Sequence, residues 1–221
     1  MAVLLEGGCR VAHMSEAAPQ VEGSLISLRV LEFAPGRSPD FRNAENDEVL
    51  FSLGSCALVI EGVEQQLEPE TGIFVPAKKT FHFENRGSKP AWLIGVQCPV
   101  TKTQPPTAVV RLADQRAMPT ADRWYRVLID SEVTQFVGSI PPGRAPDHFH
   151  EYEEVLFILR GEGRVWAGST STPTGYGSCI YLPRRQVHCV ENTGTGDLRL
   201  LGVFYPAGSP AVRYETSTQN P

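Results

Sequence analysis

The chain of 221 residues contains no run of 18 apolar residues, no Cys-x-x-Cys pair and no excess of positive charge. A membrane-spanning helix needs about 20 consecutive apolar residues, so the first absence argues against one. The cysteines are odd in number and widely spaced, which argues against a disulfide framework or a thiolate zinc site. They are Cys9, Cys56, Cys98, Cys179 and Cys189. With 20 Lys and Arg against 25 Asp and Glu, the formal net charge is -5, which provides no basic field for nucleic acid.

The opening residues MAVLLEGG lack the positive region of a signal peptide, because Glu6 and two glycines end the short apolar stretch. We therefore expect a cytoplasmic protein whose partner is a small molecule, with neither nucleic acid nor membrane as a partner. A hydrophobic fraction of 41% with 20% charged residues is typical of a folded chain. Twenty glycines and eighteen prolines interrupt runs of Val, Ile, Leu and Phe, a pattern that predicts many short strands joined by turns.

The sequence repeats itself at a spacing of 107 residues. Gly36-Arg37-Ser38-Pro39-Asp40 recurs as Gly143-Arg144-Ala145-Pro146-Asp147. The other matches follow in order: Pro76 with Pro183, Glu84-Asn85 with Glu191-Asn192, Leu93-Ile94-Gly95-Val96 with Leu200-Leu201-Gly202-Val203, and, at a spacing of 106, Glu48-Val49-Leu50-Phe51 with Glu154-Val155-Leu156-Phe157. Ordered matches at one spacing indicate a duplicated domain.

The repeat predicts an all-β protein with two tandem β-barrels. We expect the first barrel over residues 23–100 and the second over residues 126–206. An N-terminal arm (1–22), a connector with the first strand of the second half (101–125) and a C-terminal tail (207–221) complete the chain.

Histidines gather in the second copy, as His148-Phe149-His150 and His188, with Glu154 four residues after His150. On a β-strand, residues i and i+2 point to the same face about 6–7 Å apart. His148 and His150 can therefore direct both imidazoles at one point, Glu154 keeps the same parity if the strand continues, and His188 would complete the set from another strand.

These residues resemble the two motifs of the cupin superfamily. The first motif is matched by Gly143, His148, His150, Glu154 and Gly161, and the second by Gly177, Pro183, His188 and Asn192. Arg185 stands where the second motif has an inner glycine, which alters a turn and not a ligand. The resemblance implies a bicupin, with two jelly-roll barrels and a divalent metal held by His148, His150, Glu154 and His188 inside the second.

The first copy has lost this ligand set. At the 107-residue spacing, Phe41 stands for His148, Asn43 for His150 and Phe81 for His188, and only Glu48 retains its counterpart. His82 is one residue out of register, so its parity is wrong for a ligand. We expect the first barrel to be structural, with its phenylalanines in the core.

Imidazoles with one carboxylate suit Fe, Mn, Ni, Cu or Zn. Four protein ligands leave two positions of an octahedral metal, and a site charge of about +1 favours small anionic or enolisable, oxygen-rich substrates. The ligand set is similar to that of several cupin dioxygenases, which implies a dioxygenase-type oxidoreductase with Glu154 as ligand and proton acceptor. A non-redox lyase, isomerase or cyclase and a noncatalytic metabolite-binding module remain alternatives. Ureidoglycine aminohydrolases also keep the metal in the second barrel only, but their ligand pattern differs, so their activity is not transferred.

Alternation along the strands predicts the residues around the metal. The expected pocket consists of Leu156 and Ile158 on the face of Glu154, Gln186 and Val190 on the face of His188, Arg164 or Trp166 from the next strand, and Tyr152 as a hydrogen-bond donor. The N-terminal arm could also support a homodimer by strand exchange.

Overall fold

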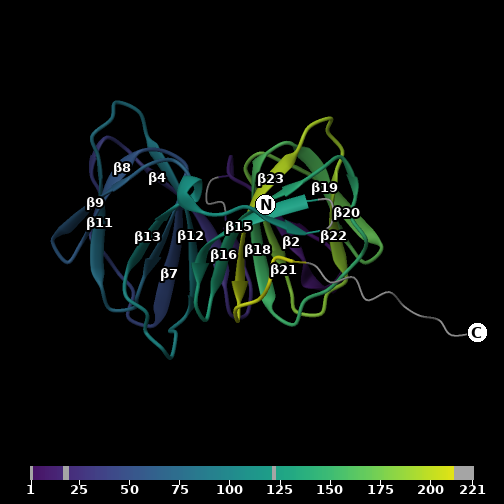
Figure 1. Ribbon diagram of the computed structural model, residues 1–221, viewed down its shortest axis with the longest axis horizontal. Helices are drawn as coiled ribbons and strands as arrows, with labels where there is room; N and C mark the ends of the chain where they lie inside the picture. The colour runs from purple at the N-terminus through teal and green to yellow at the C-terminus, as the bar shows by residue number, and fades with distance from the viewer. Residues whose placement is uncertain (1, 17–19, 121–122, 212–221) are drawn as a thin grey trace, which may run out of the picture.

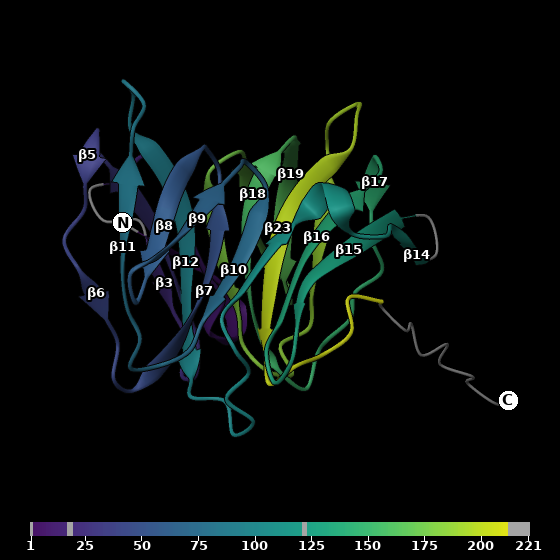
Figure 2. The same cartoon turned by 60° about the vertical axis from the view of Figure 1, so that its left-hand side comes forward.

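The computed structural model describes residues 2–16, 20–120 and 123–211, and it forms two β-barrels that lie side by side (Figures 1 and 2). Parts of the predicted arm (1, 17–19), connector (121–122) and tail (212–221) lie outside the described residues. The regular secondary structure of the described residues consists of strands and two short 3-10 helices, η1 (Glu6–Gly8) and η2 (Leu112–Asp114). In this part of the chain, no helix is long and apolar enough to span a bilayer.

The first barrel consists of a six-stranded and a five-stranded sheet. The six-stranded sheet has the order β13 (Ala108–Arg111), β10 (Thr71–Val75), β7 (Asn46–Ser52), β12 (Ala91–Pro99), β4 (Ser27–Phe33) and β3 (Gln20–Glu22). The five-stranded sheet has the order β5 (Gly36–Arg37), β11 (Thr80–Asn85), β8 (Cys56–Ile60) and β9 (Val63–Leu67), with β6 (Phe41–Arg42) also paired to β11.

The second barrel has an eight-stranded and a four-stranded sheet. The eight-stranded sheet has the order β1 (Val3–Leu4), β2 (Arg10–His13), β21 (Ser178–Leu182), β18 (Glu153–Arg160), β23 (Leu198–Tyr205), β16 (Thr134–Ile140), β15 (Arg123–Asp130) and β14 (Met118–Thr120). The four-stranded sheet has the order β17 (Gly143–Arg144), β22 (His188–Asn192), β19 (Glu162–Ala167) and β20 (Thr170–Gly175).

The strand registers show the duplication residue by residue. Glu48 lies opposite Val75 and Gln97 in the first barrel, as Glu154 lies opposite Leu182 and Phe204 in the second. Each partner in the second barrel stands 107 residues after its counterpart, so Glu48 and Glu154 occupy equivalent places. The two barrels are therefore copies of one fold, as the sequence repeat predicted.

After the glutamate, each Glu-Val-Leu-Phe segment has three apolar residues in a row, because both faces of β7 and β18 are buried. Leu50 and Leu156 point into their own barrels, whereas Phe51 and Phe157 point into a third core that lies between the barrels. Successive side chains of a strand face opposite sides, so one short segment supplies both a barrel core and the contact between barrels.

Each large sheet is extended by a strand from outside its predicted barrel. From the N-terminal arm, β2 pairs with β21 of the second barrel, with Val11 opposite Ile180. From the connector, β13 pairs with β10 of the first barrel, with Val109 opposite Ile73. Ile73 and Ile180 are equivalent by the 107-residue spacing, so the two added strands cover equivalent sheet edges.

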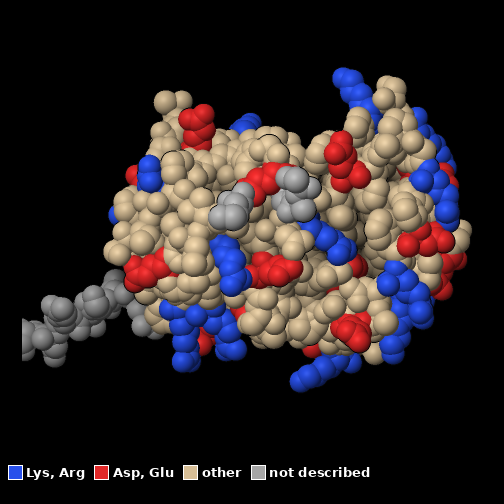
Figure 3. All heavy atoms as spheres, turned by 180° about the vertical axis from the view of Figure 1, so that it is seen from behind, with Lys and Arg blue, Asp and Glu red and all other residues tan. Residues whose placement is uncertain are grey.

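The surface carries charges of both signs close together on the face seen in Figure 3. This face therefore shows no extended single-sign field of the kind that draws nucleic acid to a protein.

Candidate metal centre

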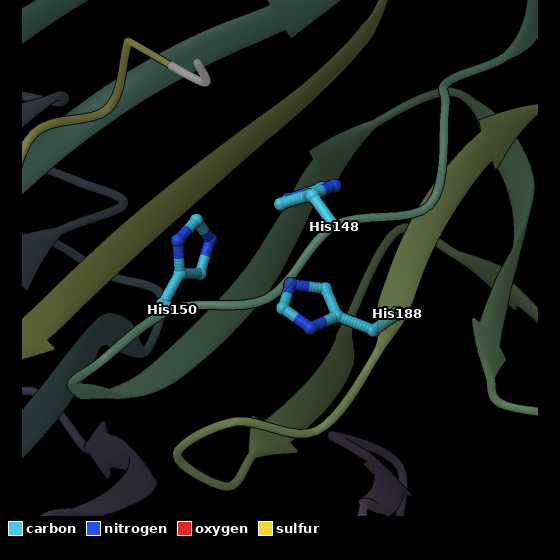
Figure 4. A group of neighbouring side chains, drawn as sticks. All are labelled: His148, His150 and His188. Atoms are coloured by element: carbon cyan, nitrogen blue, oxygen red, sulfur yellow. The ribbon is translucent and has the colours of Figure 1, made fainter. Parts of the chain in front are cut away.

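Three histidines converge at one end of the second barrel (Figure 4). His148 and His150 lie on an extended loop between β17 and β18, and His188 is the first residue of β22. His148 and His188 form an isolated antiparallel bridge, with N–O distances of 3.0 and 2.8 Å. The histidine pair was predicted on a strand, but the structure has only this bridge, which suffices to bring the two segments together.

The imidazole nitrogens of the three side chains offer one ligand atom each, and these atoms all lie within 4.8 Å of one another. The Nδ1 atom of His148 donates to the carbonyl of Pro146 at 3.1 Å, and that of His188 donates to the carbonyl of Gln186 at 2.7 Å. With Nδ1 as the donor, the lone pair of each ring lies on Nε2. Backbone carbonyls thus hold both rings in the tautomer that a metal requires.

Burial lowers the pKa of His150 to about 4 and that of His188 to about 3, and it also lowers the pKa of His148. The histidines further depress one another, since two imidazolium ions at this separation repel. All three are therefore neutral at pH 7, the state in which imidazole binds a metal.

Glu154 lies beside the histidines, with Oε2 at 3.5 Å from Nε2 of His150 and 3.7 Å from Nε2 of His188. Its side chain is only 7% exposed, and burial raises its pKa to about 8. The structure thus brings together the four residues that the sequence predicted as ligands.

The equivalent carboxylate of the first barrel has a cation beside it. Glu48 accepts two hydrogen bonds from Arg29, at 3.0 and 2.9 Å, and one from Gln97 at 2.8 Å. The strand registers place Phe136 where the first barrel has Arg29, and Phe204 where it has Gln97. A buried carboxylate is stable when a charge or hydrogen bonds compensate it. A divalent cation between Glu154 and three neutral imidazoles would supply that compensation, so the residues present fit a metal.

The other ligand positions of the first barrel hold an aromatic cluster. Phe41 and Phe81 stack at a centroid distance of 5.5 Å, and both pack against Phe83. His82 is directed instead toward Asp40 and Glu84, at 3.4 and 3.7 Å. Within the described residues, the histidine cluster of the second barrel is the one group of three or more ligating side chains close enough to hold a metal.

The histidines open into a cavity of about 80 Å³ inside the second barrel. Since one water molecule needs roughly 10–15 Å³ by this measure, the space holds a ligand of about six non-hydrogen atoms. Besides the four candidate ligands, the lining consists of Thr120, Arg123, Trp124, Tyr125, Phe136, Gly138, Ser139, Ile140, Leu156, Leu182, Val190, Leu200, Phe204 and Pro210. The mostly apolar wall lowers the local dielectric, which strengthens the electrostatic interactions at the centre.

Of the predicted pocket residues, Leu156 and Val190 line the cavity, and Ile158 packs in the barrel core away from it. Arg164 and Trp166 share the outer face of β19, where Trp166 donates to Glu191, because the inner face belongs to Val165 and Ala167.

The two remaining predicted pocket residues contact other parts of the chain. The side chain of Gln186 lies against Gly7 of the arm. Tyr152 stacks on His150, with centroids 4.6 Å apart and planes at 11°.

Several cavity residues were not predicted, among them Arg123, Trp124 and Phe136. Phe136, Gly138 and Ile140 alternate along β16, and Leu200 and Phe204 share one face of β23, so the period-2 rule could have found them. Arg123 gives no such signal. Its charge near the cavity further lowers the pKa of His148, after the larger effect of burial.

Residues 136–204 match a family model described as a cupin domain. The chain is 36% identical over 67 residues to the oxalate-binding protein of Thermotoga maritima, which is 29% of this chain and 55% of that protein. It is 31% identical over 83 residues to auxin-binding protein 1 of Arabidopsis thaliana, which is 33% of this chain and 42% of that protein. The chain thus spans about half the length of the curated relatives it matches.

Solved structures match over nearly the whole chain. A Pseudomonas aeruginosa protein described as glyoxylate induced has a TM-score of 0.78 at 16% identity, covering 97% of this chain and 95% of that one. The oxalate decarboxylase of Bacillus subtilis, studied for its Mn(II) centres, has a TM-score of 0.68 at 14% identity, covering 95% of this chain and 76% of that one. At these identities the likeness concerns the fold.

Two copies of a jelly-roll barrel, with a histidine-rich candidate metal centre in only one of them, define a bicupin. The second barrel contains the cupin domain that the family model matches over residues 136–204, and the fold of the two barrels together is similar to that of the solved oxalate decarboxylase.

Proposed function

We propose that this protein binds one divalent transition metal ion with His148, His150, Glu154 and His188 and uses it to act on a small oxygen-rich anion. The observation that carries the proposal is the exchange of Arg29 for Phe136 beside an equivalent buried glutamate, together with three neutral imidazoles around it. Fe, Mn, Ni, Cu and Zn are all consistent with this donor set. Mn is favoured by the likeness to a fold that carries Mn(II) centres.

The cavity supports a small chelating carboxylate as the ligand. A volume of about 80 Å³ admits about six non-hydrogen atoms, which is the size of oxalate. One matching relative is named as an oxalate-binding protein and one structural neighbour as oxalate decarboxylase. Oxalate is therefore the first ligand to test, followed by other small dicarboxylates and by small enolisable anions.

The proposed reaction is a dioxygenase-type oxidation, for which the bound metal would supply a Lewis acid and a centre able to engage dioxygen. In such a site the chain surrounds the anion with the apolar wall and limits the access of water, and the carboxylate of Glu154, when it is not bound to the metal, would accept and hold a proton. A second candidate is an oxygen-independent decarboxylation, which the likeness to the oxalate decarboxylase fold favours.

The test of the metal site is the metal content of the purified protein, compared between the wild type, His188→Ala and His82→Ala. We expect about one metal ion per chain in the wild type and in His82→Ala, which lies outside the ligand register, and almost none in His188→Ala. Loss of metal in neither variant, or in both, would contradict the proposed site.

The test of the reaction follows on protein loaded with Mn²⁺ or Fe²⁺ and supplied with oxalate. Dioxygen uptake would support oxidation, and carbon dioxide release without uptake would support decarboxylation. Stoichiometric oxalate binding without turnover, seen by titration calorimetry, would identify a binding module. Glu154→Gln with full metal content and full activity would exclude the proton-holding role.

A further inference from the structure

The C-terminal segment that follows β23, residues 206–211, forms part of the wall of the metal cavity. Pro210 is one of the lining residues, and Ala211 packs against the core of the second barrel. The segment is attached by Ala207, whose N–H donates to the carbonyl of Glu132 at 2.8 Å. Gly208 exchanges two hydrogen bonds with the hydroxyl of Thr134, at 3.1 and 3.2 Å.

Tyr152 connects this segment to a candidate metal ligand. Its ring stacks on His150 and lies 4.4 Å from the ring of Phe204, and its hydroxyl donates to the carbonyl of Ser209 at 3.1 Å. The fit of the segment on this ring is close, because a Cβ at Gly208 would lie 2.0 Å from Cε1 of Tyr152. A glycine is therefore required for the segment to pass over the tyrosine.

We propose that residues 206–211 are a cover over the candidate metal centre, that Tyr152 holds it closed, and that this cover restricts the histidines to ligands of about the size of oxalate. Beyond the hydrogen bond of Tyr152, the described hydrogen bonds of the segment to the rest of the barrel lie at Ala207 and Gly208, and Ala211 adds a partly buried apolar contact. Release of Ser209 would therefore leave Pro210 with only this apolar contact beyond Gly208 to keep it in the wall. The size limit rests on the proposed function, but the cover itself rests only on these contacts.

The experiment measures how fast diethylpyrocarbonate modifies His148 and His150 in the metal-free protein, followed by peptide mass spectrometry. This reagent exceeds the cavity in size and reacts with neutral imidazole. We expect severalfold faster modification in Tyr152→Phe, up to about tenfold for the loss of one hydrogen bond. Gly208→Ala should act in the same direction, since the added methyl group forces the segment off the ring. Tyr176→Phe, an exposed tyrosine, is the matched control, and the exposed His13 is the internal reference.

Unchanged modification rates in both Tyr152→Phe and Gly208→Ala would overturn the cover. A parallel titration with Mn²⁺ separates the two proposals. Accelerated modification in a protein that does not bind Mn²⁺ would keep the cover and refute the metal site. In Tyr152→Phe, unchanged modification together with weaker Mn²⁺ binding would show that Tyr152 only orients His150 and would refute the cover.

Discussion

At the scale of single residues, Glu48 and Glu154 show two different surroundings for an equivalent buried carboxylate. Both occupy the same place in their barrels, but Arg29 neutralises Glu48 permanently. Beside Glu154 the strand position of Arg29 is taken by Phe136, and its neighbours include neutral imidazoles, so ionising this carboxyl without a cation is costly. The first barrel thus lacks the histidine cluster and has an internal cation, the role that the proposed metal ion would take in the second barrel.

The metal-free protein should lose stability on both sides of a narrow pH optimum. The pKa of Glu154 is raised from 4.5 to about 8, so the folded state keeps a proton that the unfolded chain releases. The free energy of unfolding then falls as the pH rises from about 4.5 to 8, by at most about 1.4 kcal/mol per pH unit. The pKa values of His150 and His188 are lowered to about 4 and 3, so stability also falls as the pH drops below 6.5. Between pH 4.5 and 6.5 the two histidines outweigh the one glutamate, so urea unfolding in the presence of a chelator should show a maximum near pH 6.5.

The matched variant for this prediction is Glu154→Gln, which removes the carboxyl and keeps its shape. It should abolish the loss of stability between pH 6.5 and 8 and retain the loss on the acid side. An alkaline loss that is as large in Glu154→Gln as in the wild type would assign it to another group.

At the scale of elements, the N-terminal arm is part of the second barrel. Its strand β2 covers the edge of β21, and Leu5, Cys9 and Val11 belong to the barrel core. An uncovered edge strand is a site for unwanted pairing, so the arm both fills the core and protects the edge.

Adjacent leucines of the arm provide the test of this role. Leu5 is 8% exposed and Leu4 is 69% exposed. Leu5→Ala should lower the free energy of unfolding by about 2–4 kcal/mol, since it leaves a cavity in the barrel core, whereas Leu4→Ala should change it by less than about 0.5 kcal/mol. Urea denaturation measures both, and equal effects of the two substitutions would contradict the placement of the arm.

At the scale of the whole molecule, the two barrels share a hydrophobic core and a set of hydrogen bonds to the buried Glu153. Glu153 on β18 accepts hydrogen bonds from the hydroxyl of Ser24 and from the N–H groups of Leu25 and Ile26, which belong to the first half of the chain. Arg199 and Glu70 add an ion pair between the barrels at 2.7 Å. We therefore expect the two barrels to unfold in one transition.

Glu153→Ala should lower the free energy of unfolding by about 2–4 kcal/mol, because it leaves the N–H of the buried Ile26 and the partly buried donors of Ser24 and Leu25 without their acceptor. Its neighbour Glu151 is exposed and pairs with Arg185 at the surface, so Glu151→Ala should cost less than about 1 kcal/mol.

Calorimetry should show a single transition for the wild type. Two separate transitions would mean that the barrels are thermodynamically independent.

Much of the fold and the core of the candidate site follow from local patterns in the sequence. The spacing of 107 residues predicts two equivalent barrels, and the motif residues His148, His150, Glu154 and His188 predict the group that the structure brings together. The same spacing predicts the phenylalanines that replace His148 and His188 in the first barrel. These features are accessible because a repeat keeps its register and because a strand alternates its faces.

Only the tertiary structure decided which distant segments meet. The difference between Arg29 and Phe136 could be interpreted only after the strand registers placed them at equivalent positions beside Glu48 and Glu154. The pairing of β2 with β21 joins residues about 170 positions apart, and Pro210 reaches the cavity through contacts with Thr134 and Tyr152. Hydrophobic periodicity states which face of a segment is buried, but the partner of that face is selected by packing over the whole chain. That is why the candidate ligands could be predicted from the sequence, and the placement of the arm and of residues 206–211 could not.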